Sequence, residues 1–159
     1  MAFALSELQV TSSAFEHGQT IPKRHTGEGE DVSPPLAWRN LPGGTQSLAV
    51  FCHDPDAPLV TPGGDYGFVH WILYNIPSTV THLPEGAEGY TAGPTDFGKT
   101  GYGGPMPPEG HGVHFYYFWV LALNTDGQFP EGLTLWQFLE QAEPNIIGMN
   151  RLIGAYQRG

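Results

Sequence analysis

The sequence predicts an all-β fold, an antiparallel β-sandwich, from three apolar runs and the turns between them. The runs at residues 47–53, 69–75 and 114–123 are rich in β-branched and aromatic side chains. Glycines and prolines lie close to their ends, and the chain of 159 residues contains 22 glycines and 15 prolines. Strands separated by such turns, with little helix, are typical of an antiparallel sandwich.

The three runs are apolar at nearly every position, which is expected for strands that are covered on both faces. One helix is expected at residues 133–143, where Leu135, Trp136 and Leu139 recur at helical spacing and Pro144 ends the segment. The tail at residues 145–158 is ambiguous, because its two glycines count against a long helix. Without a linker or an internal repeat, residues 1–159 are expected to form a single domain.

The composition describes an acidic chain, with a formal net charge of −10 from six Lys and Arg against 16 Asp and Glu. This charge disfavours binding to nucleic acid or to anionic membranes, although it allows a local anion site. The N-terminal residues lack the pattern of a signal peptide, and no apolar stretch is long enough to span a membrane. We therefore expect a cytoplasmic protein without a disulfide, in which Cys52, the one cysteine, is a buried apolar residue.

Residues 93–100, GPTDFGKT, match the phosphate-loop pattern G-x-x-x-x-G-K-[ST]. That motif binds phosphate only where a strand leads into it and a helix follows it. The residues that follow, GYGGP at 101–105, cannot start a stable helix, and no strand-like run precedes the motif. We interpret the segment as a glycine-rich surface loop, from which Lys99 could still bring a positive charge near a site.

Two histidines lie at the starts of expected strands, directly after loops. By strand periodicity His70 shares a face with Ile72 and Tyr74, and His114 shares a face with Tyr116 and Phe118. Sandwiches commonly place binding sites at such strand ends.

An acidic turn, DPDAP at 54–58, follows the first apolar run. A carboxylate at the end of a buried strand needs a partner. Asp54, His70 and His114 are therefore candidate site residues.

Several motifs occur together in a fixed order along the chain. They are SPPLAW at 33–38, DPDAP at 54–58, H-x-x-x-x-N at 70–75, TDFGKTGY at 95–102, GYGGP-x-PP-x-G at 101–110, H-x-Y at 114–116 and IGAYQR at 153–158. The ordered set resembles the phosphatidylethanolamine-binding protein family, also called the Raf kinase inhibitor protein family, and in particular its compact bacterial branch. The resemblance covers nearly the whole chain.

The resemblance implies a Greek-key β-sandwich with a small pocket for phosphate, phosphoethanolamine or similar anions. We expect no cofactor and no bound metal. The resemblance also implies a cis peptide before Pro58, as relatives have in this turn. Transferred by motif, the ligand-binding residues are Asp54, Pro58, Phe68, His70, Pro107, Pro108, His114 and Tyr116.

The chemistry of these residue types suits an anion site. Prolines keep the loop rigid, glycines let backbone N–H groups approach an anion, and histidines donate to oxyanions. Asp54 can favour the charged form of a histidine, or it can accept a proton from a monoprotonated phosphate or from an amine of the ligand. Both roles predict tighter anion binding near pH 6 than near pH 8.

The chain departs from the family pattern at two places. Phe115 stands where relatives usually have an arginine that pairs with acidic residues of the DPDAP turn, so Asp56 needs another partner. Asn145 stands where relatives often have a histidine. The chain also lacks the longer C-terminal helix of eukaryotic relatives, which weakens any inference of kinase inhibition.

The leading hypothesis is a soluble binding protein for a small anionic or phosphorylated ligand, with a protein kinase or protease as a candidate partner. One alternative is a hydrolase, metal-dependent or acid/base, that uses Asp54, His70 and His114. Of the metal-type spacings only His111-x-x-His114 is present, and no activated nucleophile is evident. Another alternative is a surface interaction module with a vestigial pocket. The resemblance also suggests a homodimer.

Overall fold

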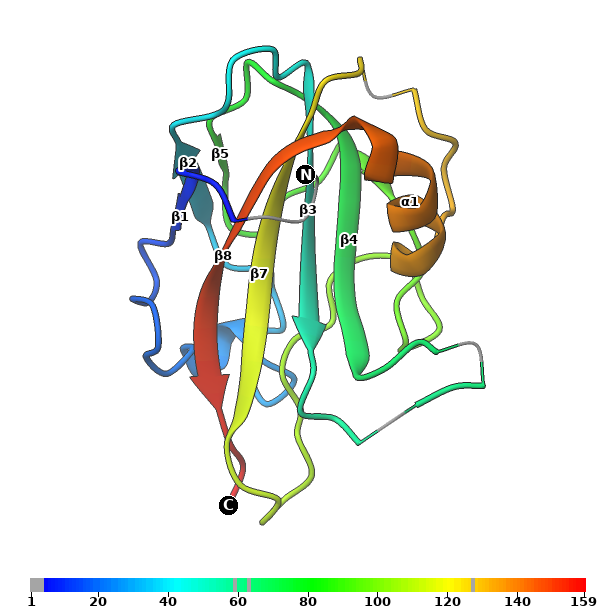
Figure 1. Cartoon of the computed structure of the whole chain (residues 1–159). Coiled ribbons are helices and arrows are strands. Elements are labelled where there is room, and N and C mark those ends of the chain that lie inside the picture. The colour runs from blue at the N-terminus through cyan, green and yellow to red at the C-terminus, as the bar shows by residue number, and fades with distance from the viewer. Residues whose placement is uncertain (1–4, 59, 63, 127) are drawn as a thin grey trace.

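The computed structural model describes residues 5–58, 60–62, 64–126 and 128–159. In this part of the chain, two antiparallel sheets pack face to face, and one helix covers the outer face of the larger sheet (Figure 1). The elements are β1 (Gln9–Thr11), β2 (Leu36–Arg39), β3 (Ser47–Asp54), β4 (Phe68–Pro77), β5 (His82–Leu83), β6 (Thr91–Ala92), β7 (His114–Leu123), α1 (Leu135–Ala142) and β8 (Ile146–Tyr156), with 3-10 turns at Lys23–His25 and Glu143–Asn145. The predicted β-sandwich is confirmed.

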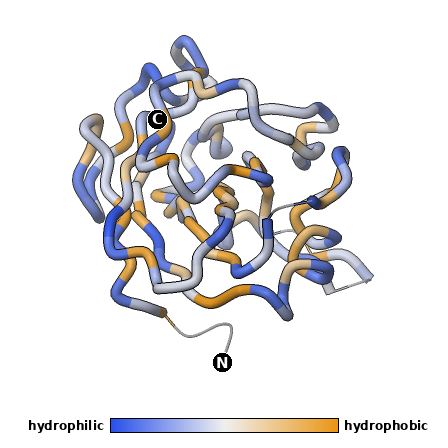
Figure 2. The backbone as a smooth tube through the Cα atoms, turned by 90° about the horizontal axis from the view of Figure 1, so that it is seen from above, coloured by the Kyte–Doolittle hydropathy of each residue, from blue (hydrophilic) through white to orange (hydrophobic). Residues whose placement is uncertain are grey.

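The larger sheet has the strand order β6-β4-β3-β7-β8, and the smaller sheet has the order β1-β2-β5. The three predicted runs correspond to β3, β4 and β7. Every residue of β3 is buried, because this central strand has the smaller sheet on one face and α1 on the other. In the view of Figure 2, many of the hydrophobic segments lie near the middle of the molecule, and many of the hydrophilic ones lie around them.

The predicted helix is present as α1, which begins after the N-cap residue Thr134. The Thr134 side chain accepts a hydrogen bond from the Gln137 N–H, and the Gln137 side chain accepts one from the Thr134 N–H. This capping box satisfies N–H groups that a helix start leaves without intrahelical partners. No helix among the described residues has the length and apolar character that crossing a membrane requires.

The ambiguous tail forms β8, the edge strand of the larger sheet. Its glycines allow other segments to pack closely against it. A Cβ atom at Gly154 would lie 2.5 Å from Ile21 Cγ1, and one at Gly148 would lie 2.6 Å from Pro42 Cγ. The two glycines therefore count against a helix, as predicted, and they suit a closely covered strand.

The ladder between β3 and β4 is irregular beside His70, where β4 has one residue more than β3. Trp71 packs in the core between the sheets, whereas Ile72 and Tyr74 pack beneath α1. His70 faces the inter-sheet side together with Trp71, so the prediction that His70, Ile72 and Tyr74 share a face is wrong. The bulge is the reason, since one extra residue breaks the strict alternation of a strand. On β7, His114 and Tyr116 do share the buried face.

Residues 93–100 form a loop, as predicted, and the chain continues through residues 101–113 without a helix. The Thr95 N–H donates to the Lys99 carbonyl, and the Thr95 hydroxyl accepts from the Phe97 N–H. Backbone N–H groups that a phosphate loop would present to a ligand are thus used within this turn.

Candidate functional site

A pocket of about 350 Å³, called the Asp54 pocket after its one charged lining residue, opens where β3 ends and where β4 and β7 begin. These strand ends lie side by side at one end of the larger sheet, because β3 is the antiparallel neighbour of both β4 and β7 (Figure 1). The pocket brings together all eight residues that the sequence singled out and adds three others. The lining residues are Asp54, Ala57, Pro58, Phe68, His70, Phe97, Met106, Pro107, Pro108, His114 and Tyr116. That these side chains contact a ligand stays a prediction.

Asp54 forms the centre of the polar floor. Its Oδ2 accepts a hydrogen bond from His114 Nδ1 at 2.7 Å, and its Oδ1 accepts one from the Asp56 N–H at 2.8 Å. The side chains of Asp54 and His114 are each only 4% exposed. A buried carboxylate requires such partners, so this pair fixes both side chains in place.

Asp56 has a hydrogen-bond partner, although Phe115 stands where relatives usually have an arginine. Its Oδ2 accepts a hydrogen bond from the Phe115 backbone N–H at 2.7 Å. A main-chain donor therefore ties the acidic turn to the start of β7 without an arginine side chain at position 115. The Phe115 side chain is 41% exposed and does not line the pocket.

His70 presents a neutral ring to the pocket. Its Nδ1 donates a hydrogen bond to the Gly103 carbonyl oxygen at 2.7 Å, which leaves Nε2 as the nitrogen available to a ligand. Burial lowers the pKa of His70 below its ordinary value, against smaller opposing effects from Gly103 and from the Asp54 charge. A neutral ring with its proton on Nδ1 offers Nε2 as a hydrogen-bond acceptor.

Tyr116 is the hydroxyl-bearing residue of the floor and is 1% exposed. Burial raises its pKa well above the ordinary value, and the negative charge of Asp54 raises it further. The side chain is therefore a phenol at any physiological pH and can donate a hydrogen bond into the pocket.

The walls and rim of the pocket are apolar. The Phe68 and Phe97 rings meet edge to face with centroids 4.7 Å apart, and both lie against His70. Phe97 and Met106 are 42% and 43% exposed and so lie at the mouth. Lys99 brings a positive charge near this mouth, with Nζ 6.0 Å from the Phe97 ring centroid.

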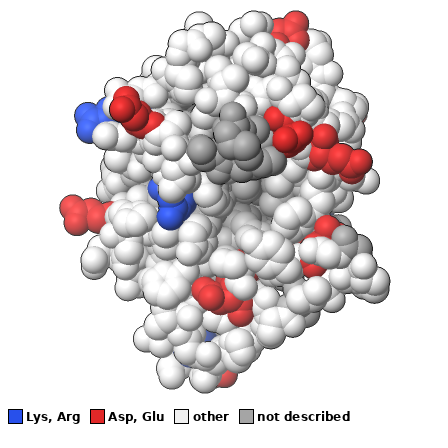
Figure 3. All heavy atoms as spheres, in the orientation of Figure 1, with Lys and Arg blue, Asp and Glu red and all other residues white. Residues whose placement is uncertain are grey.

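The electrostatic character of the pocket follows from one carboxylate. Asp54 is the single lining residue with a formal charge at neutral pH, and neither lysine nor arginine is among the eleven. Figure 3 shows acidic side chains scattered over one face with few basic ones, as the net charge of −10 requires. The pocket therefore contains no fixed positive charge to hold a dianion.

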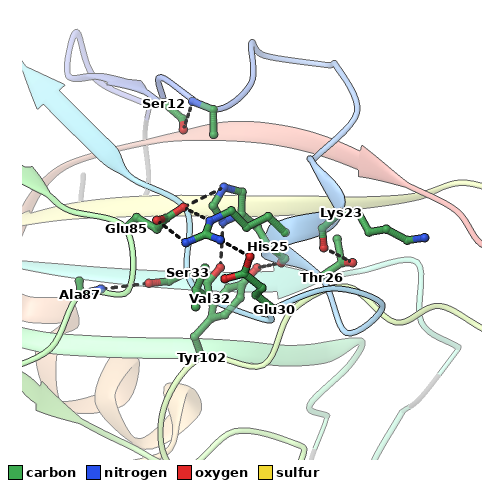
Figure 4. Close-up of polar contacts among 12 residues, drawn as sticks. Ser12, Lys23, His25, Thr26, Glu30, Val32, Ser33, Glu85, Ala87 and Tyr102 are labelled. Carbon is green, nitrogen blue, oxygen red and sulfur yellow. Dashed lines mark hydrogen bonds and ion pairs between the residues drawn. The ribbon is translucent and has the colours of Figure 1, made fainter.

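The pocket loop at 101–110 is supported from behind by the segment that precedes β2. The Tyr102 hydroxyl donates to the His25 carbonyl at 2.6 Å, and the Gly104 N–H donates to Asp31 Oδ1 at 2.7 Å. His25 in turn donates from Nδ1 to the Val32 carbonyl, which closes this segment on itself (Figure 4). The loop is thus held before a ligand arrives, which reduces the ordering cost of binding.

An ion pair anchors the same segment to the loop before β6. Arg24 donates from Nε and Nη2 to the two carboxylate oxygens of Glu85 at 2.6 and 2.8 Å. These groups are solvent-exposed, so the ion pair fixes the position of the segment but adds little to the folding stability.

Sequence reasoning missed Phe97, Met106 and the role of His111. Phe97 and Met106 line the pocket, and their signal was the position of each within a motif of the resemblance. His111 contacts His114 through a hydrogen bond, and its signal was the His111-x-x-His114 spacing. No group of three or more His, Cys, Asp or Glu side chains in the described ranges has the arrangement of a metal site.

Two smaller predictions are decided by the structure, and the surroundings of Asn145 are also defined. The Ala57–Pro58 peptide is trans, so the expected cis peptide is wrong; the trans form is the intrinsically favoured one for proline. Cys52 is fully buried and unbonded, as predicted. Asn145 donates from Nδ2 to Asn124 Oδ1 at 2.9 Å and does not line the pocket.

A second cavity of about 330 Å³ lies on the other side of β4, beside the start of α1. Its lining includes Thr61, Asp65, Thr95, Thr134 and Trp136. It contains no histidine and no buried carboxylate pair. The Asp54 pocket is therefore the stronger candidate, because buried titratable groups converge there.

The sequence matches one family of known proteins over most of its length. The model of the phosphatidylethanolamine-binding protein family matches residues 11–157. The chain belongs to this family. A relative in Aquifex aeolicus, named as a UPF0098 protein, is 38% identical over 158 residues and is matched over 95% of this chain and 89% of its own length.

Two solved structures of the phosphatidylethanolamine-binding protein family share the fold. A putative homologue from Chlamydia trachomatis has a TM-score of 0.86 at 37% identity and covers 96% of this chain and 98% of its own. YbcL of E. coli, described as a member of the mammalian family, has a TM-score of 0.87 at 35% identity and covers 97% of this chain and 100% of its own.

Proposed function

We propose that this member of the phosphatidylethanolamine-binding protein family binds a small phosphorylated ligand in the Asp54 pocket. The best match is a phosphoethanolamine-type head group that carries its own proton or cation. The observation that carries this proposal is the balance of hydrogen-bonding groups on the pocket floor, where acceptors predominate around a buried carboxylate.

The floor offers one side-chain donor and several acceptors. The Tyr116 hydroxyl can donate to a phosphate oxygen, whereas His70 Nε2 and the Asp54 carboxylate can only accept. An unprotonated phosphate would leave these acceptors without partners and would meet the Asp54 charge. A monoprotonated phosphate, or an ammonium group beside the phosphate, supplies the missing donors and offsets the charge.

The walls suit a small head group joined to a less polar part. The polar groups are buried on the floor, and Phe97 and Met106 are exposed at the mouth. A ligand that is polar at one end would leave its other end among these apolar side chains. Phosphoethanolamine and a phosphorylated amino acid share the phosphate chemistry, so a binding test must include both.

The proposal predicts binding that tightens from pH 8 to pH 6. The second pKa of a phosphate monoester is about 6, so the monoprotonated fraction falls about 50-fold between these pH values. Because the pKa of His70 is lowered, this pH dependence arises from the ligand and not from charging of His70. The expected result is a Kd for O-phosphoethanolamine that rises by up to about 50-fold from pH 6 to pH 8.

Calorimetric titration at pH 6 tests the proposal. The ligands are O-phosphoethanolamine, O-phosphoserine and inorganic phosphate, each added to wild type and to the variants Tyr116→Phe and His70→Gln. His82→Gln is the matched control, because His82 is exposed on β5 and lines a different cavity. Saturable binding that is weakened at least tenfold in both pocket variants and unchanged in His82→Gln supports the proposal. The proposal fails if wild type shows no binding at millimolar ligand.

A further inference from the structure

A chain of three side chains links the pocket floor to solvent. His114 Nδ1 lies 2.7 Å from Asp54 Oδ2, and His114 Nε2 lies 2.6 Å from His111 Nδ1. His114 is 3% exposed, whereas His111 is an exposed loop residue. His111 does not line the pocket, and its side chain is connected to the pocket floor through His114.

The direction of both hydrogen bonds follows from the carboxylate at the inner end. Asp54 can only accept, so the proton of this contact is on His114 Nδ1. In a neutral His114 ring the other nitrogen, Nε2, is then an acceptor. The proton between the two rings therefore belongs to His111 Nδ1, and both hydrogen bonds point inward toward Asp54.

This arrangement leaves His111 Nε2 as the open proton-binding position in the hydrogen-bonded series of His111, His114 and Asp54. A proton can add there without breaking either hydrogen bond, and the resulting charge is solvated by water because His111 is exposed. Charging the donor ring also strengthens the hydrogen bond to His114 and, through it, the bond to Asp54. Placing the proton on His114 Nε2 instead would require the His111 proton to move from Nδ1 to Nε2, because the two rings would otherwise present N–H groups to each other.

We propose that His111 is a positioning residue of the binding pocket that takes up one proton from solvent when an anion binds. The positive charge on His111 compensates the anion through His114 and Asp54. This inference rests on the proposed anion-binding function and adds to it the residue that supplies the protein's own proton.

Other titratable or charged groups also lie against these three side chains. They come from the turn after β3, the start of β4, β7, β8 and the C-terminal tail. They are Asp56, His70, Tyr116, Tyr156, which is the cross-strand partner of His114, and Arg158, which donates from Nη1 to the Pro107 carbonyl and accepts from the Gly110 N–H at its own carbonyl. Of these groups, His70 is the one that could compete with His111 for the proton.

Methyl sulfate is the probe that separates the protein's proton from the ligand's proton, because it has the single negative charge of a monoprotonated phosphate but no proton of its own. Its charge does not change near neutral pH, so any proton taken up on binding must go to the protein. Calorimetry at pH 7 in two buffers of different ionisation enthalpy counts these protons. Wild type is expected to take up about one proton per methyl sulfate bound, with affinity that falls up to about tenfold per pH unit above pH 7.

His111→Gln is the decisive variant, because a glutamine amide can still donate to His114 Nε2 but cannot carry a charge. Its proton uptake is expected to fall below half of the wild-type value, with a flatter dependence of affinity on pH. His82→Gln, the exposed control, should retain the wild-type uptake. Unchanged uptake in His111→Gln would overturn the inference, because His70 or His114 would then bind the proton.

A second measurement keeps the inference testable apart from the proposed function. Failure of every anion to bind would contradict the proposed function, whereas side-chain ¹⁵N spectra of the free protein test, without any ligand, which of the two rings takes up the proton. The spectra are expected to show His111 Nε2 taking up the proton while His114 keeps its proton on Nδ1. Protonation of His114 before His111 would overturn the inference.

Discussion

The substitution Asp54→Asn tests the proposal that the buried carboxylate organises the pocket. Asp54 accepts from the His114 ring at 2.7 Å and from the Asp56 N–H at 2.8 Å, and its side chain is 4% exposed. An asparagine keeps the shape of the side chain but has one oxygen, so it can satisfy only one of these donors. The other donor then faces an amide NH₂ group in a buried place.

The magnitude of the effect follows from the bond that is lost. A hydrogen bond to a charged group contributes about 1.5–3 kcal/mol, and in Asp54→Asn one such bond is replaced by a donor–donor contact. For a domain of this length, each kcal/mol corresponds to a shift in Tm of about 2–4 °C. We therefore expect Tm to fall by about 3–12 °C at pH 7.

Thermal unfolding followed by circular dichroism measures this shift, with Asp65→Asn as the control. Asp65 lies in the loop between β3 and β4 and lines the second cavity instead of the Asp54 pocket. A Tm of Asp54→Asn within a degree of wild type would refute the reasoning, because it would mean that the carboxylate is not the required acceptor of the His114 ring. A large fall in Asp65→Asn would show that the assay responds to charge alone.

Two further predictions concern stability. Because the pKa of His70 is lowered in the folded protein, the unfolded chain binds more protons below the ordinary pKa near 6.5. The contribution of neutral His70 to folding stability is therefore complete above this pH and is lost as the pH falls below it. The Tm of wild type should then fall on acidification more steeply than the Tm of His70→Gln. Gly154→Ala should cost about 1–3 kcal/mol of unfolding free energy in urea, since its Cβ would lie 2.5 Å from Ile21 Cγ1. Gly43→Ala, with open space around its Cβ, is the control, and equal stabilities of the two variants would contradict the packing argument.

The sequence was sufficient to predict the central strands and the helix because their signals are local. The runs in β3, β4 and β7 are apolar since both faces of these strands are covered, and α1 has both helical spacing and a capping residue. The tail could not be assigned, because what makes β8 a strand is its pairing with β7, and its glycines are explained by the segments that pack on it. Such contacts are not visible in a local pattern.

The site was predicted in composition but not in geometry. The ordered motifs identified the residues that line the pocket, whereas the bulge that turns His70 toward it has no signal in the sequence. Asp56 illustrates the same limit, since its partner is the backbone N–H of Phe115 and any residue other than proline at that position would supply one. The role of His111 likewise depends on the ring-to-ring contact with His114.

The measurement that most directly tests the central claim is the location of the bound ligand. Amide chemical shifts of the ¹⁵N-labelled protein, followed during titration with O-phosphoethanolamine at pH 6, report that location residue by residue. The account predicts saturable shifts that centre on His70, His114 and Tyr116, with little change at Thr134 and Trp136 beside the second cavity. Shifts centred on Thr134 and Trp136, or no shifts at millimolar ligand, would contradict it.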